Sequence, residues 1–189
     1  MRLILLMSLL ALTSGTAVAT AQEAPKTEAA DTVAVAPMRI ANGTRFGVWT
    51  VTCEALAVNE TACVLSQRLV RKSDNAFLAE VLAFQSADGA RRYMAARVPN
   101  GVYLPAGFAM KPAEGEAEET RFVWQSCSRE LCEALIDLDD AKIAELESGE
   151  RLVAGYRPSL VAQPLVFAMG ATGLKEGLDA LAASSGKKD

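Results

Sequence analysis

The sequence has no histidine among its 189 residues. Histidine is the general base of most serine and cysteine catalysis, the usual proton carrier near neutral pH and a common metal ligand, so its absence excludes these kinds of site together. An enzyme built from this sequence would depend on a carboxylate pair, a lysine base or a metal. We therefore expect a protein that is not an enzyme, with no catalytic residue, no metal ion and no cofactor.

Basic residues are too few to favour a polyanionic partner. The chain has 19 Lys and Arg against 23 Asp and Glu, which gives a formal net charge of −4. Such a surface has little with which to neutralise phosphate groups. Nucleic acid is therefore not expected as a partner, and anionic lipid is disfavoured.

Long apolar runs are also missing, except for one at the N-terminus. A basic start at Arg2 leads into the apolar stretch Leu3–Leu12, and small residues follow. This order predicts a Sec-type signal peptide over residues 1–21, cleaved near Ala19 or Ala21, and a periplasmic or secreted mature protein. A transmembrane anchor is the competing interpretation because the run is almost long enough, but polar residues interrupt it. No later segment is long and apolar enough to span a bilayer.

Residues 22–41 are rich in Ala, Glu, Thr and Pro and have little periodic apolar pattern. Such a segment buries too little apolar surface to order itself, so we expect a flexible leader. The dipeptide Asn42-Gly43 marks a turn. A single domain is expected over residues 42–184, followed by a disordered tail at 185–189.

Beyond the leader, short apolar runs alternate with turn residues, which is typical of β-strands. In the segment Val48–Cys53, Trp49, Val51 and Cys53 share one face and the threonines share the other. We expect Trp49 and Trp124 to pack in the core. About eight strands without a βαβ rhythm predict an all-β fold, an antiparallel β-sandwich. The further strands are predicted over residues 62–70, 77–85, 91–98, 121–127, 131–138, 152–157 and 165–169.

Two helices are expected beside the strands. Asp139 or Asp140 is placed to cap a short helix near 140–148. A C-terminal helix near 173–184 is predicted from leucines that recur at helical spacing and form one apolar stripe. These leucines are Leu174, Leu178 and Leu181.

Four cysteines in an exported chain indicate two disulfides. Three pairings are open, and we favour the local one, Cys53 with Cys63 and Cys127 with Cys132, because antiparallel neighbours bring such pairs within disulfide reach. A four-cysteine zinc site needs two closely spaced pairs, and the gap between Cys53 and Cys63 is too long. A redox-active pair favours Cys-x-x-Cys, and the segment CSRELC is longer.

Two acidic clusters raise the alternative of a calcium site. They lie at Glu114–Glu119 and at Asp137–Asp140. Calcium needs six or more oxygens that converge on one point. A solvated loop explains the first cluster, and a strand end with a helix cap explains the second. No metal site is therefore predicted.

The segment Val102–Met110 is apolar but contains Pro105 and Gly107, which suit an edge, a bend or a bulge. Such a segment leaves an apolar patch open to a partner. Packing of the same side chains in the core is the competing interpretation. The candidate interaction surface consists of Tyr103, Leu104, Phe108 and Met110.

Four segments in a fixed order carry a family resemblance: FGVWTVTCE with TACVLSQRL, then RVPNGVYLPAGFAM, then QSCSRELCEALIDLD. With the strand and leucine helix that follow, they resemble the invasion-associated locus B (IalB) proteins, exported proteins of bacteria, over about Phe46 to Leu181. The resemblance implies a periplasmic location, an immunoglobulin-like sandwich and, in pathogens, a role linked to host-cell invasion. It supplies no catalytic residues.

The function expected from these observations is protein–protein contact with an unidentified envelope or host protein; no oligomeric state is predicted. The alternative is a small-molecule or lipid-binding module that uses residues 102–110, and an enzyme is the third hypothesis. A closed cavity lined by Tyr103, Phe108 and a tryptophan would favour a ligand. A flat apolar edge strand would favour a partner, and convergent carboxylates in a cleft would favour an enzyme.

Overall fold

A computed structural model describes residues 40–58, 60–115, 118–149 and 151–185. The predicted signal peptide, the leader up to residue 39 and the tail from residue 186 lie outside the described residues.

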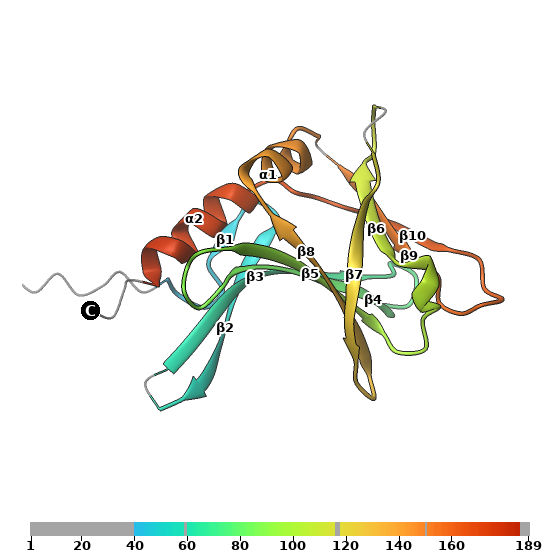
Figure 1. Ribbon diagram of the computed structural model, residues 1–189, viewed down its shortest axis with the longest axis horizontal. Coiled ribbons are helices and arrows are strands. Elements are labelled where there is room, and N and C mark those ends of the chain that lie inside the picture. Colours follow the sequence, from blue (N-terminus) through green and yellow to red (C-terminus); the bar gives the residue numbers. More distant parts are fainter. Residues whose placement is uncertain (1–39, 59, 116–117, 150, 186–189) are drawn as a thin grey trace, which may run out of the picture. The chain divides into compact units, whose positions relative to one another are not determined.

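Ten strands, two α-helices and one 3-10 turn are seen in the described residues (Figure 1). The strands are β1 (Arg45–Phe46), β2 (Trp49–Ala57), β3 (Glu60–Val70), β4 (Phe77–Gln85), β5 (Arg92–Pro99), β6 (Phe108–Pro112), β7 (Thr120–Cys127), β8 (Leu131–Leu138), β9 (Leu152–Tyr156) and β10 (Leu165–Met169). The helices are α1 (Asp140–Glu147) and α2 (Leu174–Ser184), and the 3-10 turn η1 spans Leu104–Ala106.

Every pair of neighbouring strands is antiparallel, and the order is continuous: β1-β2-β3-β4-β5-β8-β7-β6-β9-β10. Strand β7 changes partner along its length, because Phe122 pairs with β6 and Val123 pairs with β8. A register shift between Trp124 and Ser126 follows directly. A strand that switches partners at a bulge makes a corner between two layers.

The two layers meet across the core. Tyr156 on β9 donates a hydrogen bond from its Oη to the carbonyl oxygen of Leu78 on β4, at 3.0 Å. The predicted all-β, sandwich-like fold is therefore confirmed, with its layers formed by one sheet that turns at β7.

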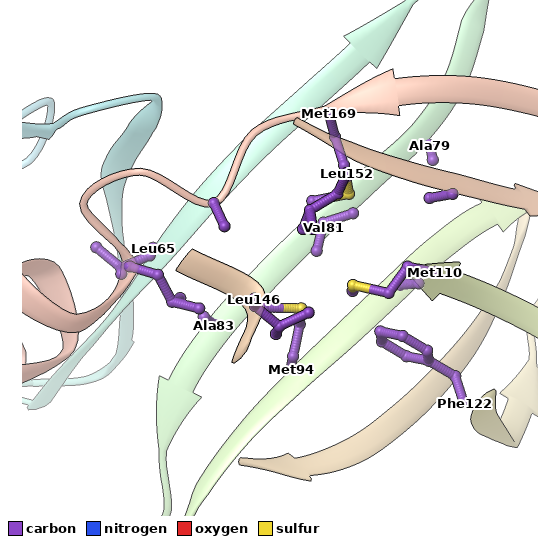
Figure 2. Close-up of a cluster of buried hydrophobic side chains, with 14 of the residues drawn as sticks. Leu65, Ala79, Val81, Ala83, Met94, Met110, Phe122, Leu146, Leu152 and Met169 are labelled. Carbon is purple, nitrogen blue, oxygen red and sulfur yellow. The ribbon is translucent and has the colours of Figure 1, made fainter. Parts of the chain in front are cut away.

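Alternation along the strands fills the core. Trp49, Val51 and Leu65 are fully buried, and each occupies the inward position that the sequence pattern predicts. Figure 2 shows buried side chains from both layers and from α1 gathered in one cluster, among them Leu65, Val81, Met94, Met110, Phe122, Leu146 and Leu152.

Both predicted helices are present and cover this inner face. The Asp139 carboxylate caps α1 by accepting a hydrogen bond from the backbone N–H of Lys142, at 2.7 Å. Helix α2 lays its apolar stripe on the core, and Gly177 allows it to approach Leu65 closely, since an added Cβ would lie 2.7 Å from the Leu65 methyl carbons. The buried stripe consists of Leu174, Leu178 and Leu181.

Residues 102–110 differ from the single bent strand that the sequence predicts. Pro105 sits in the first turn of η1, and Gly107 has φ 76°, a conformation that favours glycine. The strand β6 therefore begins only at Phe108.

Candidate interaction surfaces

The four cysteines form two local disulfides, and none is free. Cys53 and Cys63 face each other across β2 and β3, and Cys127 and Cys132 face each other across β7 and β8. The Cα atoms are 4.0 Å apart in both pairs. Each disulfide closes a hairpin near its turn, so the cysteines serve the scaffold.

Two residues of the candidate interaction surface are in the core. The side chain of Phe108 is 0% exposed and that of Met110 is 1% exposed. The reason is that β6 is paired on both edges, by β7 and β9, so that alternate side chains point into the cluster shown in Figure 2. Phe108 packs edge-on against Phe122 at 4.9 Å between ring centroids. The prediction that Phe108 and Met110 face a partner is therefore wrong.

Tyr103 and Leu104 lie at the surface beside the loop between β9 and β10. The N–H of Tyr103 donates to the carbonyl oxygen of Arg157 at 2.9 Å, and the Arg157 guanidinium lies over the Tyr103 ring at 5.9 Å. Trp124 donates its indole N–H to the carbonyl oxygen of Leu104 at 2.9 Å. The Leu104 side chain remains 45% exposed. Trp124 is half-buried, whereas Trp49 is fully buried.

Strand β10 is an apolar edge strand, which the sequence does not reveal. It pairs with β9 on one side, and no backbone hydrogen bond within the described part of the chain reaches its other side. Val166 on this strand is 61% exposed, and Leu160 and Val161 in the loop before it are 63% and 90% exposed. No charged residue lies between Arg157 and Lys175. We call Leu104, Leu160, Val161 and Val166 the β10 edge surface; Figure 1 shows the loop beside η1.

A second surface is the outer face of β3, β4, β5, β8 and β7, opposite the core. Both helices and the other layer pack on the inner face, and no described helix or strand covers the outer one (Figure 1). Arg68, Glu80, Arg97 and Glu133 stand opposite one another on four adjacent strands and form what we call the charge ladder. The Arg97 guanidinium lies 2.7 Å from the Glu133 carboxylate and 4.0 Å from that of Glu80.

The acidic residues that the structure describes have separate partners. No group of three potential ligands is found in the residues that the structure describes. Asp139 caps α1, and Asp140 pairs with Arg92 at 2.6 Å, so these neighbours bind different partners. The hydrogen bond from Arg92 holds the pKa of Asp140 below its ordinary value. Residues 116–117 of the first cluster lie outside the described residues.

Two open hollows lie on the outer face. One, of about 470 Å³, lies over β7 and β8, and the other, of about 510 Å³, lies over β1 to β4. Neither is lined by Tyr103, Phe108 or a tryptophan, so neither is the closed cavity that would favour the ligand hypothesis. Among the described helices, none has both the length and the apolarity needed to cross a membrane.

Two disulfide-closed hairpins, a sheet that turns at β7 and two helices on its inner face define a disulfide-bonded, mainly antiparallel all-β protein. The sequence model of the invasion associated locus B (IalB) proteins matches residues 49–182, so the chain belongs to this family, as the sequence segments predict. The crystal structure of invasion associated protein b from Bartonella henselae is similar, with a TM-score of 0.59 and 20% identity over 74% of this chain and 94% of that chain. This likeness supports the fold alone. No curated protein matches the sequence.

Proposed function

We propose that the protein acts after export, by protein–protein contact in the bacterial envelope, and that the β10 edge surface makes this contact. The observation that carries the proposal is an edge strand with exposed apolar side chains and no charged residue on it or in the loop before it after Arg157. Proteins usually protect such edges with charge, because an open strand pairs readily with another chain. The unprotected edge favours a partner over a small ligand.

The two disulfides support the export part of the proposal, because such bonds persist mainly outside the reducing cytosol. They agree with the signal peptide that the sequence predicts. In a pathogen, the same contact would serve colonisation of host cells, the role from which the family takes its name.

The geometry supports binding by strand addition. A partner strand alongside β10 would hydrogen-bond to its outward backbone groups and lay alternate side chains against Val166 and Ala168, which are both exposed. Leu160 and Val161 would extend the apolar contact beyond the strand. The partner segment is thus expected to be extended in conformation and apolar in its side chains.

The test is photo-crosslinking in cells that express the full chain. A photoreactive residue at Val161 or Val166 is expected to give an adduct with an envelope protein. The matched control is Val58, which is 92% exposed but lies in the turn after β2, in the hairpin closed by Cys53 and Cys63. Adducts at none of the three positions, or the same adduct at all three, would contradict the proposal.

A charged edge supplies the second arm of the test. Val161→Lys and Val166→Lys together are expected to abolish the adduct formed from a photoreactive residue at Leu160, because lysine protects an open strand. The free energy of unfolding is expected to change by less than about 0.5 kcal/mol, since both side chains are exposed. An adduct that persists in this variant places the contact elsewhere.

A further inference from the structure

The outer face carries three kinds of residue in parallel rows that cross the strands. The charge ladder is one row. Next to it runs an aliphatic row, in which neighbours on adjacent strands stand opposite each other: Leu82, Ala95, Leu135 and Val123. Beyond this row, Phe84 on β4 stands opposite Tyr93 on β5, with 5.7 Å between ring centroids.

The order of signs in the charge ladder is self-complementary. From β3 to β8 the signs alternate, positive on Arg68, negative on Glu80, positive on Arg97 and negative on Glu133. A two-fold axis parallel to the strands, above the line between β4 and β5, reverses this order in a second copy. Each charge then meets its opposite.

The same two-fold axis matches the aromatic row and the centre of the aliphatic row. It places Phe84 over Tyr93 and Leu82 over Ala95 of the second copy. Leu135 and Val123 fall over Ser66 and Thr50, the residues that continue the aliphatic row on β3 and β2 of the second copy. Leu82 and Ala95 are buried, at 5% and 1% exposed, so the contact is made mainly by the aromatic pair, the charge ladder and the exposed Val123.

We propose that two copies of this chain associate face to face through the outer face. Opposite charges would meet in two symmetric pairs of contacts, Arg68 with Glu133 of the second copy and Glu80 with Arg97 of the second copy. None of the ion pairs in the described residues includes Arg68, whose guanidinium lies over the Phe77 ring at 4.6 Å, so its charge has no carboxylate partner among them. An interface that maps one patch onto itself is the ordinary form of a two-fold dimer.

The area of the outer face sets the expected affinity of the dimer. Five strands and three rows cover about 24 Å by about 20 Å, or about 500 Å² per copy, below the roughly 800 Å² of a standard interface. The dimer is therefore expected to dissociate in the micromolar range. Because its contacts are partly ionic, the dissociation constant is expected to rise at least about tenfold between 50 and 500 mM salt.

The test is sedimentation equilibrium of the mature protein and two charge variants. Glu80→Lys with Glu133→Lys makes the ladder wholly positive, and Arg68→Glu with Arg97→Glu makes it wholly negative. Each variant alone is expected to be monomeric, and an equimolar mixture of the two is expected to form the dimer. The loop variant Glu114→Lys with Glu118→Lys has the same change of net charge as the positive variant and is expected to dimerise like the wild type. Circular dichroism verifies that each variant is folded.

Three outcomes would overturn the proposal. A wild-type protein that stays monomeric at about 1 mM in 50 mM salt has no such dimer, whatever the variants do. A positive variant that still dimerises uses another surface. A mixture of two folded variants that remains monomeric shows that the charge ladders do not meet. None of these results bears on the β10 edge surface, which lies on a different strand.

Discussion

Tyr156 is a polar side chain placed in the core with its hydrogen bond satisfied. The residue is 6% exposed, its ring stacks on that of Phe108, and its Oη donates to the carbonyl oxygen of Leu78. Burial disfavours the ionised phenolate and raises the pKa of Tyr156 above its ordinary 10.0. The hydroxyl therefore links the two layers as a neutral donor.

Removing the Tyr156 hydroxyl is expected to change the stability of the protein by an amount that depends on pH. Tyr156→Phe is expected to lower the free energy of unfolding by about 1 kcal/mol at pH 7, because it leaves the Leu78 carbonyl without its donor. Since the folded pKa is raised, the contribution of the neutral phenol is fully present below pH 10 and is lost as the pH rises through the folded value. Urea unfolding of both proteins at pH 7, 9 and 10.5 measures this; a gap that stays constant up to pH 10.5 would contradict it.

Single residues also show where prediction from the sequence ends. The inward positions of Trp49, Val51 and Leu65 follow from strict alternation, and the structure buries all three. Phe108 and Met110 could not be placed in this way. Their burial depends on β9, which follows much later in the chain and covers one edge of β6. Local pattern gives the period of a strand but not its neighbours.

At the scale of elements, the strands and helices were largely predictable and their partners were not. Strong turn signals such as Asp88-Gly89 separate hairpin strands that pair in chain order from β2 to β5. The partner switch at Phe122 and Val123 has no sequence signature, because both residues continue an ordinary strand. The open edge of β10 follows from that switch, since it determines which strands end the order.

Each disulfide crosslinks one hairpin, so removing a disulfide is expected to loosen that hairpin more than the rest of the domain. Cys53→Ala with Cys63→Ala is expected to cost about 2–3 kcal/mol of unfolding free energy, as expected for a crosslink that closes a short loop. Amide exchange is expected to increase most at residues 54–62, because the crosslink closes only that hairpin, and to increase in β4 and β5 only as far as the loss of global stability requires. Hydrogen exchange read by mass spectrometry tests this.

The control for the hairpin prediction is the other disulfide. Cys127→Ala with Cys132→Ala is expected to leave exchange at residues 54–62 as it is in the wild type, because the second bridge joins β7 to β8. Equal loosening of both hairpins by either pair of substitutions would show that the bridges stabilise the domain as a whole.

At the scale of the whole molecule, the turn between β1 and β2 meets the start of α2. Trp49 donates its indole N–H to the carbonyl oxygen of Ala171 at 3.2 Å, and the N–H of Val48 donates to that of Thr172 at 3.2 Å. Gly47 and Gly173 both have positive φ and pass backbone against backbone. The first and last elements of the described domain are therefore joined at one crossing.

This crossing predicts an unusually costly glycine substitution. In Gly173→Ala, the φ of 87° is strained for alanine and the new Cβ would collide with the carbonyl group of Phe46. We expect a loss of about 3 kcal/mol or more in the free energy of unfolding, of which conformation alone accounts for about 1 kcal/mol. Gly101→Ala is the matched control, because Gly101 has φ 97° and no atom within 4 Å of the added Cβ. Urea unfolding followed by tryptophan fluorescence compares the two variants. Equal losses of unfolding free energy would mean that the backbone at Phe46 and Gly47 moves away from the new Cβ at no energetic cost. The two ends of the domain would then not be held together by close backbone packing.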